Sequence, residues 1–574
     1  MAKNKTILSL GVLAFVFGAA LTSCGPTSNP TTPTTEPSTE PSVSVPDPFV
    51  SDVESNLVMD EDYVEHSKTY GDGKYSYDPA KWYVNDLDKV PLPDPHVFYE
   101  DGKYYITGTS DTGNARFLDM YVTEDFNYFE YKGKIYDPAN YKGWEANPAL
   151  LYAPEVYCFD GVYYLYYSAI SRHDGVRYMS VVSSNNILGP YAPIVNDEVD
   201  GLNNPLFVNG TRTALDATIF TDTDGKMYMY YSVAYKGQYC AGVELENPYT
   251  AKWDTYKELV FPGPVSTEET EKLLDWECWR GSDIAEAPYM IKSQGKYYLT
   301  YSVNGCWNKY YNVCYAVSDT PLGNFVKPYR EGELWTNLLL GYPGPKESDD
   351  LVYNQWSGFA SGTGHHCFFN IGDQIMIGYH AHRNRDWNSD SDFTQRYFAM
   401  DYLHFDKDGV PYVNGPSWSP QPLPEAISGY KNIAPNATIR SENITQPEVL
   451  NDQYIVDCYN LPGELEKEAT IGKGLAYVEL TFDKEYKVGG FSIYNTSDYN
   501  NAFFDIKYVD FGNGNAVKDL TFNEAKFINL GYEFIHPMSA FTVEFNNDIK
   551  ATKMTICFEL SYGGALNEIS ILGY

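Results

Sequence analysis

Three carboxylates stand near the start of the same strand in three copies of one repeated phrase. They are Asp94 in PDPHV, Asp216 in LDATIF and Glu286 in IAEAPYM. The acids of the turns, Asp101, Asp160 and Asp224, are separate residues, so turn formation does not explain all three. Acids brought together in a partly buried place are costly unless they pair, bind a cation or transfer protons. The sequence therefore predicts an acid site.

Glycoside hydrolysis is a reaction that needs facing carboxylates and no Ser-His, Cys-His or phosphate-binding loop. One acid protonates the leaving oxygen, a second activates water, and a third raises the pKa of the proton donor. Use of the acids only to hold a metal is the alternative. The protein would then bind glycans without cleaving them.

The elements that must position these acids are five repeats, each an apolar run, a turn and an aromatic β-run. Strand–turn–strand repeats at this wide spacing are typical of a β-propeller, and further β-rich segments between them supply outer strands. The sequence predicts an all-β fold, a five-bladed β-propeller followed by a β-sandwich (jelly-roll) domain. The repeats are PDPHVFYEDGKYYITGTSD, APEVYCFDGVYYLYYSA, LDATIFTDTDGKMYMYYSV, AEAPYMIKSQGKYYLTYSV and GTGHHCFFNIGDQIMIGYH, from residues 93, 153, 215, 285 and 362. Aligned on their turns, they give Asp94, Ala153, Asp216, Glu286 and about Gly364–His365 at one phase.

The repeats resemble glycoside hydrolase family 43, a family of five-bladed, inverting arabinofuranosidases, xylosidases, arabinanases and galactanases. The likeness covers about residues 85–425, most of the chain, and rests on PDPHV, LDATIF and IAEAPYM in that order; the expected catalytic domain is 85–428. It implies that Asp94 is the general base, Asp216 the pKa modulator and Glu286 the general acid. Inversion predicts that the Asp94 and Glu286 carboxyl groups lie roughly 6.5–9.5 Å apart.

The same resemblance implies two further site residues. His365 in SGTGHHC matches a family histidine near the axis that in several members helps to hold calcium, directly or through water; His366 is the adjacent alternative. No cofactor is expected to be required, and Ca²⁺ at the axis is a candidate. Arg396 falls where the family has a substrate-contacting arginine, with a surface salt bridge as the alternative.

Aromatic side chains pack well against apolar sugar faces. Trp144, Tyr152 and Trp356 are predicted substrate contacts, although the family often has Trp where this chain has Tyr152. Trp276, Trp307 and Phe359 are further aromatic residues of this kind, and most other aromatics are expected in the blade cores.

The C-terminal residues 429–574 contain no tryptophan and read as alternating strands. The N-x-A opening and the closing LNEISILG resemble discoidin (factor 5/8 type C) modules, which often bind sugars. A structural wedge against the propeller is the alternative.

The N-terminus has the layout of an export signal. Lysines precede an apolar run that is too short for a transmembrane helix, and small residues lead into Cys24. This resembles a bacterial lipobox, with residues 1–24 as signal and a lipid on Cys24; ordinary signal cleavage is the alternative. Residues 25–50 read as a Pro/Thr/Ser-rich linker and 51–84 as a lead-in, so we expect a protein exported and lipid-anchored at the bacterial cell surface.

The charge balance of 41 basic against 77 acidic residues, net −36, argues against nucleic acid as a partner. A neutral polysaccharide or oligosaccharide fits this charge, as does simple solubility, and the only expected membrane contact is the lipid anchor. The combined prediction is an inverting glycosidase that removes terminal α-L-arabinofuranosyl or β-xylosyl units from plant polysaccharide. Long loops at 256–283 and 335–360 favour a closed exo pocket; endo-arabinanase or galactanase activity, or a silent glycan-binding propeller, are the alternatives.

Overall fold

The computed structural model is almost entirely β, and residues 52–574 form one compact unit. The residues it describes are 58–59, 77–85, 90–110, 116–194, 198–199, 202–210, 212–234, 237–263, 277–278, 283–307, 310–328, 337–341, 360–383, 395–417, 419–455, 468–496, 503, 505–512, 515–521 and 540–574. The predicted signal, Cys24 and the linker lie outside them. None of the helices in these ranges is long and apolar enough to cross a membrane.

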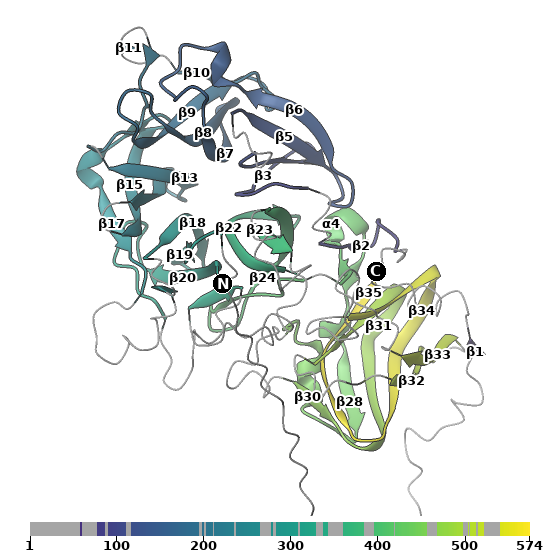
Figure 1. The fold of residues 1–574 in the computed structure, drawn as a ribbon. Helices are drawn as coiled ribbons and strands as arrows, with labels where there is room; N and C mark the ends of the chain where they lie inside the picture. The colour runs from purple at the N-terminus through teal and green to yellow at the C-terminus, as the bar shows by residue number, and fades with distance from the viewer. Residues whose placement is uncertain are drawn as a thin grey trace, which may run out of the picture. The chain divides into compact units, whose positions relative to one another are not determined.

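Five antiparallel sheets of at least four strands follow one another along the chain (Figure 1). Each begins with one of the predicted repeats, whose two strands pair across the expected turn. The first sheet contains β3 (His96–Glu100), β4 (Lys103–Thr107), β5 (Leu118–Thr123) and β6 (Glu130–Tyr136). The second contains β7 (Leu151–Phe159), β8 (Val162–Ile170), β9 (Arg177–Ser184) and β10 (Ala192–Pro193). The third contains β13 (Thr213–Thr221), β14 (Met227–Ala234), β15 (Gln238–Asn247), β16 (Thr250–Ala251) and β17 (Lys257–Val260).

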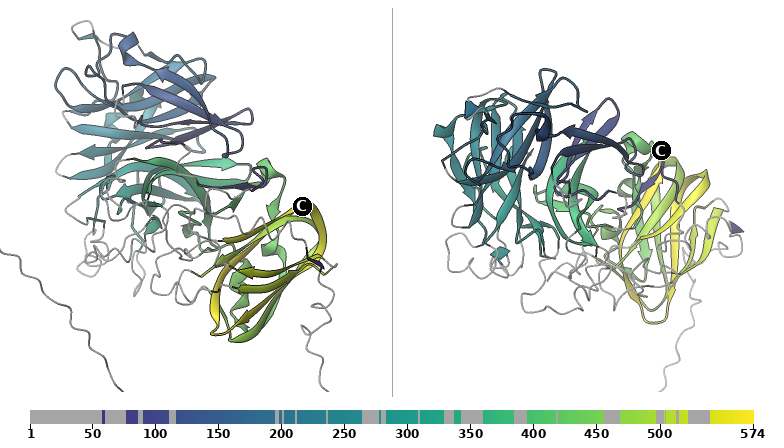
Figure 2. Two further views of the ribbon diagram at one scale, coloured as in Figure 1. Left: turned by 45° about the vertical axis from the view of Figure 1, so that its right-hand side comes forward. Right: turned by 45° about the horizontal axis from the view of Figure 1, so that its top comes forward.

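The last two blades have the same order. The fourth contains β18 (Ala285–Ser293), β19 (Lys296–Val303), β20 (Asn312–Ser318) and β21 (Leu338–Leu340). The fifth contains β22 (Ala360–Ile371), β23 (Gln374–Arg383), β24 (Tyr397–Phe405) and β25 (Pro411–Val413). The first strand of each blade contacts the first strand of the next, and β22 returns to contact β3. The predicted five-bladed propeller is confirmed, and Figure 2 shows its sheets from two further sides.

Local sequence explains why these segments fold as blades. Valine, isoleucine and tyrosine fill the strands, where β-branched and aromatic side chains pack well. The Asp101-Gly102 and Asp160-Gly161 turns both have positive φ at both residues, as tight hairpins require. The buried faces of neighbouring blades then pack together, for example Met120, Leu151 and Leu165 in one cluster.

The C-terminal strands form a second sheet system around their own apolar core. Two long strands, β31 (Gly474–Asn495) and β34 (Ala540–Leu560), pair along their lengths with register shifts near their middles. One half of β31 also pairs with β28 (Thr438–Glu442) and the other half with β35 (Gly564–Gly573). The remaining strands are β27 (Lys431–Asn432), β29 (Ile444–Thr445), β30 (Ala469–Ile471), β32 (Asp505–Asp510) and β33 (Asn515–Thr521).

The lead-in contacts both parts of this unit. β1 (Val58–Met59) pairs with β33 of the C-terminal sheet, whereas β2 (Trp82–Tyr83) pairs with β26 (Gln421–Pro422), just after the fifth blade. The lead-in therefore adds one strand to the edge of the C-terminal sheet and one strand beside the propeller.

Candidate active site

The inner strands of the blades share one unusual residue. Asp94, Ala153, Asp216, Ala287 and His365 all have φ between 44° and 60°, although none is glycine. Side chains rarely adopt this left-handed conformation, so its appearance once in every blade marks an imposed geometry. Four of these residues, all except Asp94, lie within the first strand of their blade. Each of the four stands at a register shift between the first and second strands.

A ring of hydrogen bonds closes around these five residues. The backbone N–H of Ala153 donates to Thr109 Oγ1 (2.9 Å), that of Asp216 to Ser168 Oγ (3.1 Å) and that of Ala287 to Ser232 Oγ (3.0 Å). His365 donates in the same way to Ser302 Oγ (2.9 Å), and Asp94 to His380 Nδ1 (3.2 Å). Each acceptor lies on the second strand of the preceding blade or just after it, so the ring locks every inner strand to its neighbour.

This ring corrects the predicted alignment in the fourth blade and narrows the predicted Gly364–His365 to one residue in the fifth. The residue equivalent to Asp94 and Asp216 is Ala287, and Glu286 precedes it by one position. In the fifth blade the equivalent residue is His365. Only two acids therefore share one phase. The turn between β13 and β14 is longer than the turn between β18 and β19, so counting back from the turn aligned Glu286 with Asp216.

Asp94 lies in a cationic setting. It is buried, and its Oδ1 accepts a hydrogen bond from Arg396 Nη1 (2.8 Å) while Oδ2 accepts one from Thr109 Oγ1 (2.6 Å). The Nδ1 atoms of His365 and His380 lie 3.2 and 3.3 Å from Oδ1. Burial alone would raise the pKa of Asp94, but the charge of Arg396, followed by that of His365, holds it well below the usual range. Asp94 is therefore ionised at neutral pH.

Glu286 lies in the opposite kind of setting. Its Oε1 accepts a hydrogen bond from Tyr311 Oη (2.8 Å), and its Oε2 accepts one from Gln238 Nε2. Burial, followed by the charges of Asp216 and Asp94, raises the pKa of Glu286 to about 8, against the effect of these hydrogen bonds. Glu286 therefore carries a proton at neutral pH.

Asp216 is the third acid, and its carboxyl group interacts with those of both Asp94 and Glu286. Its Oδ2 accepts hydrogen bonds from Ser232 Oγ (2.8 Å) and from the backbone N–H of Ala287 (3.3 Å), the residue after Glu286. Burial raises the pKa of Asp216, and so does the charge of Asp94, whereas the charge of His365 lowers it. Its negative charge in turn is the main electrostatic cause of the raised pKa of Glu286.

The two histidine alternatives separate clearly. His365 faces Asp94, whereas His366 is buried and its Nε2 lies 2.6 Å from Thr300 Oγ1. Burial lowers the pKa of His366 to about 3, so this imidazole is neutral. His365 is the histidine that belongs to the acid site.

The donors around His365 do not fit calcium bound directly by the protein. Calcium takes six to eight oxygen ligands, whereas the Asp94 carboxylate already pairs with a guanidinium and two imidazoles. Among the described residues, no three His, Cys, Asp or Glu side chains are arranged to hold a metal.

The predicted aromatic contacts have different surroundings. Tyr152 is half-buried next to Ala153, and the Arg177 guanidinium lies 4.7 Å above its ring. Trp144 is only 2% exposed and packs on Tyr167 and Tyr178. This packing is at odds with a sugar-stacking role, because the blade core covers its ring faces. Trp356 and much of the two long loops lie outside the described residues.

Sequence reasoning missed several residues of the site. Gln238, Tyr311 and Arg177 come from positions without a repeat signal, although Arg177 acts on the pKa of Asp216. The hydroxyl groups of Ser168, Ser232 and Ser302 did have a signal, because each follows the aromatic run at the same place in its repeat.

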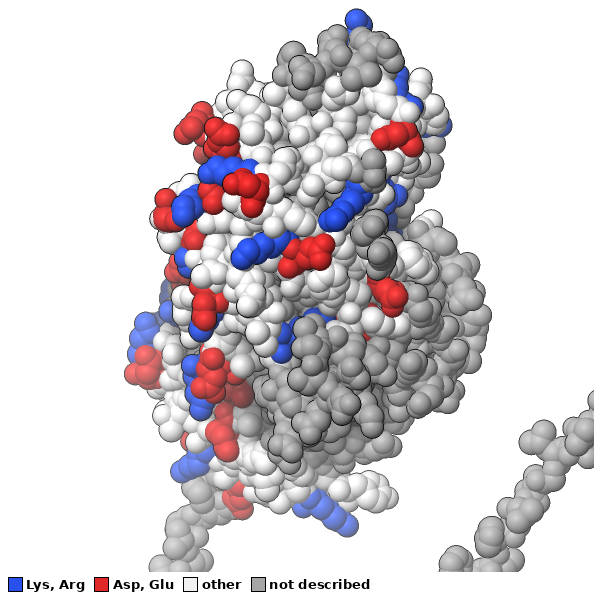
Figure 3. All heavy atoms as spheres, turned by 90° about the vertical axis from the view of Figure 1, so that its left-hand side faces the viewer, with Lys and Arg blue, Asp and Glu red and all other residues white. Residues whose placement is uncertain are grey.

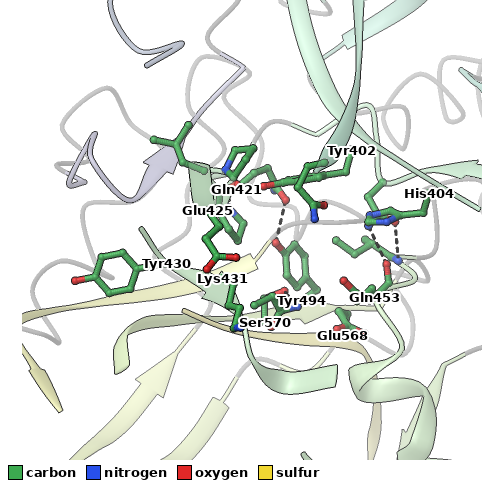
Figure 4. A pocket seen from close by; sticks show the side chains of 17 residues that line it. Tyr402, His404, Gln421, Glu425, Tyr430, Lys431, Gln453, Tyr494, Glu568 and Ser570 are labelled. Atoms are coloured by element: carbon green, nitrogen blue, oxygen red, sulfur yellow. Dashed lines mark hydrogen bonds between the residues drawn. The ribbon is translucent and has the colours of Figure 1, made fainter. Parts of the chain in front are cut away.

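A cavity of about 210 Å³ lies away from the acid site (Figure 4). Side chains of the fifth blade, including Tyr402 and His404, face Tyr494, Glu568 and Ser570 of the C-terminal sheet across it. None of the three acids lines this cavity, so it takes no part in the chemistry of the acid site.

Comparison with known proteins gives a consistent result. Residues 87–411, more than half of the chain, match the family described as glycosyl hydrolases family 43. An extracellular exo-alpha-(1->5)-L-arabinofuranosidase of Streptomyces chartreusis is 26% identical over 310 residues, which cover 51% of this chain and 80% of that protein. A xylosidase/arabinosidase of Bacteroides ovatus is 26% identical, covering 43% of this chain and 79% of that protein. A solved thermostable family-43 glycoside hydrolase is 28% identical with a TM-score of 0.47, covering 60% of this chain and 99% of that one.

Proposed function

The chain belongs to glycosyl hydrolase family 43 and is a glycosidase, and from this premise we propose the bond it cleaves and the role of each acid. The proposed reaction removes terminal α-L-arabinofuranosyl units, or β-xylosyl units, from plant cell-wall polysaccharide or its oligosaccharides. The relatives named for arabinofuranosidase and xylosidase activity support this choice of sugars.

The observation that carries the proposal is the opposite charge state of two nearby carboxyl groups. Asp94 is ionised and can take a proton, whereas Glu286, with a pKa of about 8, holds a proton that it can give. Such a separation of pKa values assigns the base and the acid of an inverting glycosidase.

The proposed step is a single displacement. Asp94 removes a proton from water while the water oxygen attacks the anomeric carbon. The Glu286 carboxyl group gives its proton to the glycosidic oxygen as the bond to the anomeric carbon breaks. Asp216 keeps Glu286 protonated through its negative charge, and inversion follows because the water attacks opposite to the leaving group.

Substrate contacts and location are part of the same proposal. Arg396, His365 and Tyr152 are proposed to contact the sugar that is released, with Arg177 as an addition from the structure. Export with lipid attachment at Cys24 is supported by the lipobox-like sequence and by extracellular relatives. Charged side chains of both signs are interspersed on the face in Figure 3.

The test compares the wild type with Glu286→Gln on arabinan, xylan, their oligosaccharides and the corresponding glycosyl fluorides. We expect a loss of about 10²–10⁴ in kcat on natural linkages, because general acid catalysis contributes about that much. The loss on fluorides should be far smaller, because fluoride leaves without protonation. Full activity of Glu286→Gln on a natural linkage would overturn the assigned acid. Glycan binding by a wild type that cleaves nothing would favour the silent propeller.

A further inference from the structure

Trp307 is far more exposed than the other tryptophans that the structure describes. Its side chain is 62% exposed, whereas Trp82 and Trp144 are buried and Trp253 is half-buried. Large aromatic surface in water is unfavourable and is often functional when it lies beside a binding site.

The strand register brings Trp307 close to Glu286. In the fourth blade Ser302 is paired with Glu286 and Val303 with Ala285, so the chain leaves β19 at the end where Glu286 lies. Trp307 follows four residues later. The same connection then returns to Glu286, because the hydroxyl group of Tyr311 donates to its Oε1.

Cys306 gives a second indication of this position. The pKa of its thiol is raised to about 12, mainly by burial. The charges of Arg396, Glu286, Asp94 and Asp216 also affect this pKa. Its carbonyl oxygen lies 2.7 Å from His382 Nε2, and His382 Nδ1 lies 3.0 Å from the carbonyl oxygen of Gln395, next to Arg396. His382 therefore fixes the backbone beside Trp307 to the strand segment that carries Arg396.

Gly305 shows how the indole is held. A Cβ atom added at Gly305 would lie 2.4 Å from the Trp307 ring, so the ring lies directly against the glycine backbone. A larger residue at 305 would displace the ring. One part of the ring is thus supported by backbone while the rest remains open to a ligand.

We propose that Trp307 is a stacking platform for the sugar on the leaving-group side of the cleaved bond. Glu286 protonates the oxygen of that leaving sugar, so a surface held beside Glu286 meets the part of the substrate that departs. The apolar face of a pyranose or furanose ring would cover the exposed indole. This inference rests on the proposed function and adds to it a subsite for the leaving-group sugar.

The test uses substrates with and without a leaving-group sugar. For Trp307→Ala we expect kcat/KM on the trisaccharide that the wild type cleaves to fall at least tenfold, mainly through KM. The loss on the glycosyl fluoride of the same sugar should be less than threefold. Trp307→Phe should recover most of the activity, and Gly305→Ala should show the same selective loss because it displaces the ring.

Tyr128→Ala is the matched control, since this side chain is 71% exposed on the first blade and lies outside the site. It should leave both substrates unaffected. Equal losses on the two substrates for Trp307→Ala, or no loss, would overturn the platform. If the wild type cleaves no glycoside, the proposed function fails. Calorimetric binding of the trisaccharide to Glu286→Gln, with and without Trp307→Ala, then decides the platform, and unchanged affinity would overturn it.

Discussion

Two carboxyl groups of similar intrinsic acidity differ in charge state here because their neighbours differ. Asp94 is next to a guanidinium and two imidazoles, and Thr109 donates to it as well. Glu286 has only neutral donors, Gln238 and Tyr311, and feels two negative charges. The acid and base roles are thus set by surroundings that no single residue type determines.

Asp216→Asn should reduce general acid catalysis by Glu286, because it removes the charge that keeps Glu286 protonated. For the wild type, kcat/KM should fall as pH rises through about 8, because Glu286 then loses its proton. Without the charge of Asp216, the pKa of Glu286 falls and this basic limb moves to lower pH. At pH 8 the variant should lose about tenfold or more of the activity on a natural linkage, a part of the roughly 10²–10⁴ from acid catalysis.

The measurement is the pH profile of kcat/KM on an oligosaccharide. Asp224→Asn is the matched control, because this acid lies in the exposed turn of the same blade, where its Oδ1 accepts from the backbone of Lys226. Its profile should match that of the wild type. An unchanged basic limb in Asp216→Asn would contradict the role of Asp216 as pKa modulator.

At the scale of elements, the hydrogen-bond ring explains how five separate blades hold one site. Hydroxyl groups at the ends of the second strands accept the backbone N–H of the next inner strand in four places, and His380 does so in the fifth. Burial lowers the pKa of His380 to about 3. A neutral imidazole can accept through Nδ1, which allows a histidine to close a ring otherwise made by hydroxyl groups.

Ser232→Ala and Ser302→Ala separate the structural part of this ring from its chemical part. Ser302→Ala leaves the buried backbone N–H of His365 without its acceptor and should lower the free energy of unfolding by about 1–3 kcal/mol. Ser232→Ala should lower it less, because the backbone N–H of Ala287 keeps its longer hydrogen bond to Asp216 Oδ2. Only Ser232 also donates to the Asp216 carboxylate. We therefore expect Ser232→Ala to shift the basic limb of kcat/KM and Ser302→Ala to leave its position unchanged.

Chemical denaturation and pH profiles of the two variants check this expectation. Equal changes in the pH profile would mean that the hydroxyl group of Ser232 acts only on the backbone.

At the scale of the whole molecule, hydrogen bonds join the fifth blade and the lead-in to the C-terminal sheet. Tyr494 Oη donates to Gln421 Oε1 (2.9 Å), and Asn414 Nδ2 donates to the carbonyl oxygen of Gln453 (2.9 Å). Lys81 Nζ reaches the carbonyl oxygens of Gly489 and Phe545. These contacts support the alternative that residues 429–574 are a structural wedge against the propeller. The cavity in Figure 4 lies beside the same contacts.

Tyr494→Phe tests whether this seam couples the two parts. The variant leaves the buried Gln421 Oε1 without its donor, which should cost about 1–3 kcal/mol. All ten tryptophans precede residue 432, so tryptophan fluorescence reports unfolding of the N-terminal part alone. A lower denaturation midpoint by this signal is expected although the substitution lies in the C-terminal sheet.

Tyr562→Phe is the control, because this tyrosine is 97% exposed on the same sheet. It should leave the midpoint unchanged. A wild-type midpoint in Tyr494→Phe would show that the propeller unfolds independently of the seam.

The sequence by itself determined the blade count and the inner strands, and it predicted the three acids. Strand–turn–strand repeats are local patterns, and Asp94, Asp216 and Glu286 each stand within one repeat, so counting residues finds them. His365 and Arg396 were reached through family resemblance, and the structure brings both against Asp94.

Only the tertiary structure decided the charge states of the acids and which tryptophans are exposed. The register that makes Ala287 the equivalent of Asp216, and the approach of Gln238 and Tyr311 to Glu286, depend on how the blades fold and pack. The same packing buries Trp144 and leaves Trp307 exposed, although both are tryptophans in connections between strands. Burial and pKa depend on neighbours distant in sequence, and for that reason repeats and motifs could predict the acids but not their protonation.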